Sequence, residues 1–138
     1  MTAEVRPARR DEIAAILQLW AEAAAEPGVP DGPEAVEALL DRDEGSLIVG
    51  VVNGELAGAI VAGWDGWRGS IYRLAVLEAH RREGLGLHLV NEAEAFLRAR
   101  GARRIQALVY ANDDRARAFW EAAGYVLDER LVRYVRNA

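Results

Sequence analysis

The chain contains no cysteine and no lysine. Without cysteine it has no disulfide, no thiolate nucleophile and no cysteine-ligated metal site. All 17 basic residues are arginine, so no lysine is present to form a Schiff base, to serve a phosphate-binding P-loop or to become acetylated. These two absences exclude several covalent and metal-based mechanisms.

Long apolar runs are also missing, since no stretch approaches the ~20 residues that a membrane span needs. The first residues, 1–6, lack the apolar core of a signal peptide. We therefore expect a cytoplasmic protein with no membrane partner. The 138 residues suit a single domain, residues 1–138, with a sizeable core.

Charge is divided unevenly along the chain, which has a net charge of −5. Residues 1–70 carry 5 arginines and 13 acidic residues, a net of −8, whereas residues 71–138 carry 12 and 9, a net of +3. A basic half beside an acidic half suits an anionic cofactor and a cationic substrate, although ordinary surface charge explains it equally well. The negative total argues against nonspecific nucleic-acid binding.

Apolar periodicity and turn residues predict alternating strands and helices. Strands are expected over residues 2–7, 47–52, 55–64, 70–77, 104–110, 126–128 and 131–136. Helices are expected after a cap at Asp11, over 34–41, from the 81–86 turn to Gly101, and from a cap at Asn112 or Asp113 to Gly124. The pair Asn53-Gly54 predicts a type I′ hairpin turn. This order implies a mixed α/β sheet with helices on both faces.

The turn Arg81-Arg82-Glu83-Gly84-Leu85-Gly86 lies between a predicted strand and a predicted helix. Glycines let the backbone approach a ligand, and the unpaired N–H groups and dipole of a helix N-terminus favour an anion. The sequence therefore predicts a phosphate-binding site here. No G-x-x-x-x-G-K-[ST] motif occurs, and the third glycine of a dinucleotide fingerprint is missing, so a nucleotide-binding module is disfavoured.

In this setting the chain resembles the GCN5-related N-acetyltransferase (GNAT) superfamily over nearly its whole length. The 81–86 turn matches the family's Q/R-x-x-G-x-G/A motif, and Phe119-Trp120-Glu121-Ala122-Ala123-Gly124-Tyr125 matches a second signature. The segment 63–70 looks like that of a small, single-domain bacterial branch. The resemblance implies the acyl-CoA N-acyltransferase fold, with a central, mostly antiparallel sheet.

The resemblance also implies acetyl-CoA as co-substrate, with no metal. It assigns the CoA pyrophosphate to the turn and the first helical residues: Arg81, Arg82, Glu83, Gly84, Leu85, Gly86 and Leu87. It pairs the strand edge at Leu74, Ala75 and Val76 with the pantetheine arm, as an added strand would pair. The family's pantetheine-binding asparagine corresponds to Asp113 here, with Asn112 one residue earlier, so a shifted or a lost contact both remain open.

The usual catalytic side chains are missing. Trp120 stands where relatives often have a tyrosine general acid, and indole N–H donates a hydrogen bond but is not a useful acid. Tyr110 is the first substitute, at the expected end of the 104–110 strand, and Tyr72 is the second. For each, the alternative is a tyrosine that caps the core.

No base is evident either, because Ser70 and Leu108 occupy positions where some relatives carry glutamate. Glu22, Glu26 and Asp65 lie on segments that line the acceptor side in relatives, and each is otherwise a solvated carboxylate. Ordered water is a further alternative. Trp67, in a glycine-rich loop, is a candidate for substrate contact. His80 and His88 do not form a metal site.

The leading hypothesis is an acetyl-CoA-dependent N-acetyltransferase that acts on a primary amine of a small molecule or a protein N-terminus. The amine would attack the thioester directly in a ternary complex. The alternative is a CoA-binding regulatory module with lost or weak turnover. Pairing of the last strand across a homodimer is left open.

Overall fold

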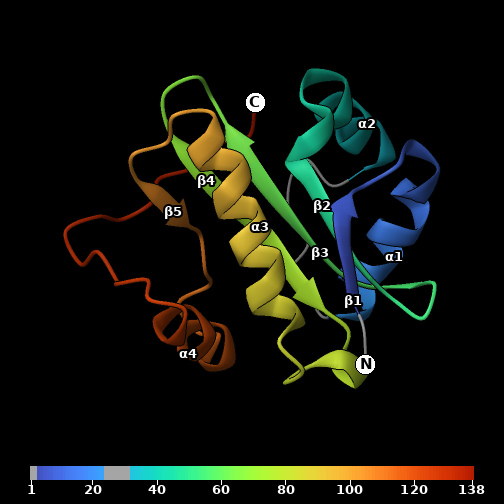
Figure 1. Cartoon of the computed structure of the whole chain (residues 1–138). Helices are drawn as coiled ribbons and strands as arrows, with labels where there is room; N and C mark the ends of the chain where they lie inside the picture. The colour runs from blue at the N-terminus through green and yellow to red at the C-terminus, as the bar shows by residue number, and fades with distance from the viewer. Residues whose placement is uncertain (1–2, 24–31) are drawn as a thin grey trace. The chain divides into compact units, whose positions relative to one another are not determined.

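Five strands form one sheet in the order β1-β2-β3-β4-β5 (Figure 1). Neighbouring strands are antiparallel, except that β5 runs parallel to β4. This arrangement confirms the predicted mixed, mostly antiparallel sheet. The strands are β1 (Ala3–Pro7), β2 (Leu47–Val52), β3 (Glu55–Trp64), β4 (Gly69–Val76) and β5 (Ile105–Ala107).

The computed structural model describes residues 3–23 and 32–138. The chain divides into two compact units, Met1–Ala107 and Leu108–Ala138. The first unit contains the sheet with α1 (Ile13–Glu22), α2 (Pro33–Arg42) and α3 (Leu85–Ala99). The second unit contains α4 (Asp114–Ala122).

Alternating side chains of the sheet place α1 and α2 on one face and α3 on the other (Figure 1). Ile16 of α1 and Leu40 of α2 belong to one buried cluster with Val49 of β2. The next residue, Gly50, lies on the opposite face, where a Cβ atom would meet Leu85 of α3. Helices therefore cover both faces, as the element order predicts.

The β2–β3 hairpin forms with the predicted bounds. Asn53 and Gly54 have φ angles of 52° and 80°, the positive values that a type I′ turn requires. Both strands have neighbours on each side in the sheet, and most of their residues are buried.

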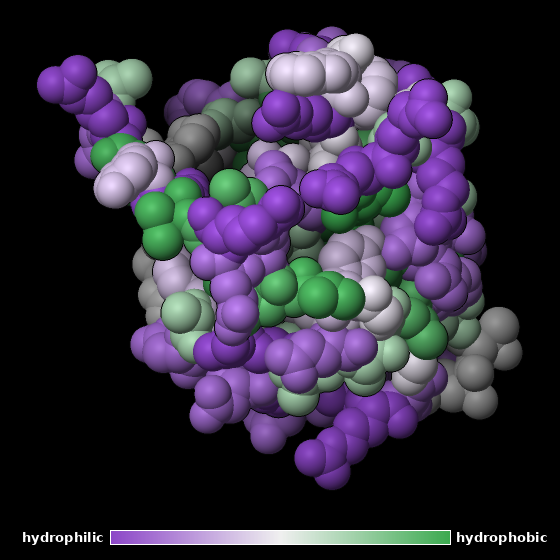
Figure 2. Space-filling view, turned by 90° about the vertical axis from the view of Figure 1, so that its left-hand side faces the viewer, coloured by the Kyte–Doolittle hydropathy of each residue, from purple (hydrophilic) through white to green (hydrophobic). Residues whose placement is uncertain are grey.

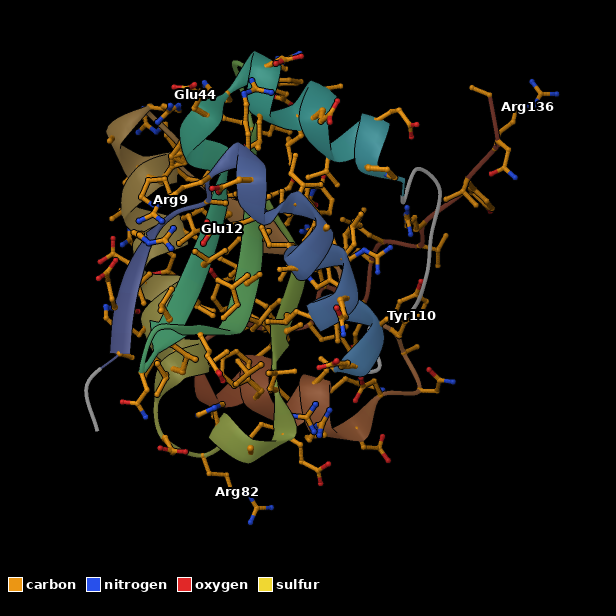
Figure 3. All side chains as sticks on the ribbon, turned by 90° about the vertical axis from the view of Figure 1, so that its right-hand side faces the viewer. Arg9, Glu12, Glu44, Arg82, Tyr110 and Arg136 are labelled. Atoms are coloured by element: carbon orange, nitrogen blue, oxygen red, sulfur yellow. The ribbon has the colours of Figure 1, made fainter. Side chains whose placement is uncertain are left out.

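The start of α1 differs from the prediction of a cap at Asp11. A short 3-10 turn, Arg10–Glu12, precedes α1, and Asp11 lies inside this turn. Glu12 acts instead: its carboxylate accepts the backbone N–H of Arg9 at 2.8 Å and two hydrogen bonds from Arg6 at 2.9 and 2.7 Å. Figure 3 shows Glu12 close to Arg9 at the beginning of α1. The longer side chain reaches both partners and ties the 3-10 turn to β1, while α1 itself has no side-chain cap.

We expect Glu12→Gln to lower the free energy of unfolding by about 1–2 kcal/mol at neutral pH, since it removes a charge-assisted pair whose side chains are only 15% and 19% exposed. The hydrogen bonds from Arg6 hold the pKa of Glu12 below its ordinary value of 4.5. The carboxylate therefore contributes stability above that value, and the contribution is lost as the pH falls through the folded-state pKa.

Urea unfolding at neutral and acidic pH measures this effect. Glu37→Gln is the matched control, because Glu37 is an exposed helical glutamate that makes no ion pair with the described residues. The gap between Glu12→Gln and wild type should shrink at acidic pH, and an equal gap at both pH values would contradict the assignment.

The last strand, β5, is shorter than the predicted strand 104–110, and the second unit begins directly after it. β5 ends at Ala107, so Tyr110 lies in the loop before α4 rather than in a strand. Asp113, not Asn112, caps α4, since its Oδ1 accepts the N–H of Ala116 at 3.0 Å. α4 ends before Gly124, as predicted.

The two predicted closing strands, residues 126–128 and 131–136, do not form. Their apolar residues are exposed, including Val126 (90%) and Tyr134 (93%). Alternation of apolar residues produces a strand only where a neighbouring backbone supplies hydrogen bonds, and no pairing of these residues occurs within the described chain. Figure 2 shows apolar groups exposed among hydrophilic ones on one side of the molecule.

None of the helices in the described residues is long and apolar enough to cross a membrane.

Candidate active site

The predicted phosphate-binding turn connects β4 to α3. A short 3-10 turn, Glu78–His80, follows β4, and α3 begins at Leu85. Two residues between them have left-handed backbones: Arg82 with φ 64° and Gly84 with φ 87°. Gly84 is the N-cap of α3 and supplies no side-chain cap. The chain therefore turns sharply into the helix and leaves its N-terminus uncovered by a capping side chain.

Backbone N–H groups from Arg82 to Leu87 make no hydrogen bond with any described residue. The first helical bond runs from the His88 N–H to the Gly84 carbonyl at 3.0 Å. The position of a Cβ atom at Gly84 would have no atom within 4 Å, so the space in front of the turn is open. Unpaired donors at the positive end of a helix dipole, facing open space, fit an anionic group.

The arginines of this turn have different roles. The guanidinium of Arg81 donates to the Val76 carbonyl at 2.9 Å and to the Ala23 carbonyl at 3.3 Å, which ties the turn to β4 and to the end of α1. The side chain of Arg82 is exposed and points away from the ribbon (Figure 3). Glu83 is exposed as well. Arg82 is therefore the freer cation beside the open N–H groups.

The outer edge of β4 is open over its second half. β5 pairs with β4 only from Gly69 to Ile71, and no other strand of the described sheet continues along that edge. Leu74 and Val76 are partly buried, and Ala75 belongs to the core beneath α1. An extended ligand can therefore pair with this edge as a strand would.

A bulge shapes the same segment. Ala59 pairs with Ala75 and Val61 with Tyr72, so β4 carries one more residue than β3 between these pairs. Arg73, inside the bulge, has φ 55°. Its carbonyl accepts the indole N–H of Trp20 at 3.0 Å, which fixes the bulge to α1. Only the fold brings Trp20 to β4, so the neighbouring sequence does not predict this contact.

Two glycines that were likewise not predicted from the sequence set the position of α3. Gly50 and Gly58 are register partners in β2 and β3. A Cβ at Gly50 would lie 2.7 Å from Leu85, and one at Gly58 would lie 2.9 Å from Leu89 and 3.0 Å from the Ala75 carbonyl. These glycines thus let the first turns of α3, and the open N–H groups before them, lie close to the sheet.

The two candidate acids belong to different units. Tyr72 is on β4, 38% exposed, and its ring lies over Gly63, where a Cβ would be 3.0 Å from Cε2. Tyr110 is in the second unit and 53% exposed. Neither hydroxyl makes a hydrogen bond with the described residues. Both remain available for proton transfer.

The second unit also contains the remaining predicted pantetheine contact. The Asp113 carboxylate is engaged in capping α4. Asn112 makes no side-chain hydrogen bond with the described residues, so its amide is available. Trp120 is 8% exposed and makes edge contacts with Phe119 and Tyr125 at ring-centroid distances of 5.4 and 4.8 Å. Trp120 is therefore a buried packing residue of this unit.

The candidate bases are partly engaged. Glu22 accepts a hydrogen bond from Gln18 at 3.0 Å. The backbone N–H groups of Arg68 and Trp67 donate to Asp65 at 2.5 and 2.7 Å and hold its pKa below the ordinary value, which keeps it ionised. Glu26 lies outside the described residues.

Trp67 and His80 are two further residues that the sequence singled out. The Trp67 ring is 74% exposed and carries the Arg68 guanidinium at 4.0 Å from its centroid. Nδ1 of His80 is buried without a hydrogen-bond partner among the described residues. No group of three or more histidine, aspartate or glutamate residues in the described segments could hold a metal ion.

Comparison with known proteins identifies the family. The model of the Acetyltransferase (GNAT) family matches residues 13–125. A protein named acetyltransferase from Pectobacterium atrosepticum is 32% identical over 135 residues, which cover 94% of this chain and 96% of that one. The chain therefore belongs to the GNAT acetyltransferase family and is an N-acetyltransferase.

Solved structures share the fold. Ard1 from Thermoplasma volcanium superposes with a TM-score of 0.82 at 21% identity, covering 93% of this chain and 85% of that one. The PaiA N-acetyltransferase from Thermoplasma acidophilum, solved in complex with coenzyme A, gives 0.80 at 14% identity, covering 94% and 92%. At these identities the likeness establishes the fold.

Proposed function

We propose that this GNAT-family chain, as one N-acetyltransferase domain, transfers acetyl from acetyl-CoA to a primary amine of a small molecule or a protein N-terminus. The observation that carries the proposal is the run of unpaired N–H groups from Arg82 to Leu87 beside the open edge of β4. A pyrophosphate needs the first feature and an extended amide-bearing arm needs the second. Coenzyme A has both parts, and the similarly folded PaiA N-acetyltransferase was solved with it.

The cofactor roles follow from this placement. The backbone of Arg82, Glu83, Gly84, Leu85, Gly86 and Leu87 would donate to the pyrophosphate, with the Arg82 side chain adding positive charge. Arg81 would support the turn through its bonds to Val76 and Ala23. Leu74, Ala75 and Val76 would pair with the pantetheine arm, which Asn112 would also contact.

The chemistry then requires two proton transfers. A neutral amine attacks the thioester carbonyl in a ternary complex, so that a C–N bond forms and the C–S bond breaks. The attacking nitrogen must lose a proton and the leaving thiolate must gain one. Tyr110 or Tyr72 would supply the second proton, since both hydroxyls are uncommitted. Water would accept the first, and Asp65 and Glu22 are the alternative bases among the described residues.

A CoA-binding regulatory module with weak turnover is the second candidate. Trp120 favours it, because an indole stands at the position where the resemblance implies a tyrosine general acid.

Calorimetric titration with acetyl-CoA, followed by a thiol-release assay with a broad amine and peptide panel, tests both functions. We expect saturable binding and turnover with at least one amine. Absence of binding at millimolar acetyl-CoA would refute both functions, whereas binding without any turnover would favour the regulatory module.

A further inference from the structure

A shallow hollow lies on the α2 side of β4, inside the first unit. It has a volume of about 210 Å³ and is lined by residues of α2, β3, β4 and the turns between them. We call it the α2–β4 hollow. Its apolar walls are Leu39, Trp64 and Tyr72, and two nearly buried hydroxyl groups, Ser46 and Ser70, also line it. Because Tyr72 precedes the open edge of β4, the hollow adjoins the segment proposed to hold the acyl donor.

The hydroxyl groups differ in what they can still bind. Ser46 donates to the Asp43 carbonyl at 2.7 Å and is therefore committed. The Ser70 oxygen accepts a hydrogen bond from Gln106 at 2.9 Å, but its own proton has no acceptor among the described residues. Ser70 is only 7% exposed, so a hydrogen-bond acceptor supplied by a ligand would satisfy it.

Two carboxylates of the hollow are already engaged. Asp43 forms an ion pair with Arg100 at 2.9 Å. Asp65 accepts the backbone N–H groups of Trp67 and Arg68. Both carboxylates therefore already have hydrogen-bond donors within the protein.

Two arginines of the hollow have no carboxylate hydrogen-bonded to them. The side chain of Arg42, at the end of α2, makes no hydrogen bond or ion pair with the described residues. Arg68 stacks on Trp67, and its guanidinium makes no hydrogen bond with a described carboxylate. Although Arg68 also acts electrostatically on Asp65, the free hydrogen-bond donors of the hollow are on guanidinium groups, and a guanidinium fork suits a carboxylate.

We propose that the α2–β4 hollow binds the carboxylate of the acceptor, so that the substrate class is a small amino acid-like amine with an apolar body. This inference rests on the proposed function. Arg42 and Arg68 would bind the carboxylate, and Leu39, Trp64 and Tyr72 would contact the body. The volume lies below the ~300–1,000 Å³ of a drug-sized pocket, which favours a small acceptor over a large one.

Matched acceptors test the charge requirement. Each amino acid in a panel is compared with its own carboxamide, and a diamine of similar length is included. We expect kcat/KM to be at least about tenfold higher for the acid of the best pair, the scale of one charge-assisted hydrogen bond. Equal rates for acids and amides, or a preference for the diamine, would overturn the proposal.

Arg42→Gln and Arg68→Gln test the residues. Each should lower kcat/KM for the acid by about 10- to 100-fold and leave the amide and the KM for acetyl-CoA unchanged. Arg98→Gln is the control, because Arg98 is an exposed arginine of α3, on the other face of the sheet. A loss that is equal for acid and amide would refute the proposal.

A binding readout separates this inference from the proposed function. Trp64 and Trp67 lie in or beside the hollow, so tryptophan fluorescence should change saturably with the amino acid in the presence of CoA, and not with its amide. If acetyl transfer fails for every amine, this titration still decides whether the hollow binds a carboxylate. Transfer without any carboxylate preference would overturn the inference alone.

Discussion

Tyr110→Phe is expected to lower kcat by about 10²–10⁴-fold, the usual span for loss of a general acid. The exchange removes one hydroxyl that makes no hydrogen bond with the described residues and is on a 53% exposed side chain, so folding should be unaffected. Because the hydroxyl acts only when the thiolate leaves, the KM for acetyl-CoA should stay within about threefold of wild type.

Tyr72→Phe is the matched comparison, since it also removes one uncommitted hydroxyl. If Tyr72 is the acid, the fall in kcat moves to this variant and Tyr110→Phe becomes nearly silent. Steady-state kinetics with saturating amine separate the two cases. Unchanged kcat in both variants would mean that neither phenol protonates the thiolate.

The central hairpin was predictable because its signals are local. The bounds of β2 and β3 match the prediction, since Asn53-Gly54 allows one tight turn and the flanking apolar runs are long enough to pair. The β4–turn–α3 unit was predictable for the same reason. Its glycines and its helical apolar stripe lie within one continuous segment of the chain.

The errors fall where an outcome depends on a distant partner. Residues 126–136 alternate as strands do, but a strand also needs a neighbouring backbone, which alternation cannot supply. Asp11 has the chemistry of a helix cap, but the chain forms a 3-10 turn there, in which Glu12 is bound by Arg6 of β1. Gly50, Gly58 and Trp20 affect the site only through α3 and the β4 bulge, so their own sequence neighbourhoods give no functional signal.

Gly84→Val is expected to weaken acetyl-CoA binding by about 10²–10³-fold, because it disturbs the turn in two ways. A β-branched residue at φ 87° is strained, so the turn would relax and misalign several N–H donors that each contribute to a charge-assisted hydrogen bond. The new side chain would also extend into the open space in front of the turn, where a Cβ meets no protein atom within 4 Å. The dissociation constant from calorimetry measures the effect.

Gly101→Val controls for the strain alone. Gly101 follows the other end of α3, has φ 105° and likewise has open space at its Cβ position. Both variants should lose about 1–3 kcal/mol of stability, the cost of a strained backbone residue. Only Gly84→Val should lose acetyl-CoA affinity, because only that glycine lies at the N-terminus of α3, where the helix dipole and the unpaired N–H groups attract an anion. Equal weakening in the two variants would place the cofactor contact outside this turn.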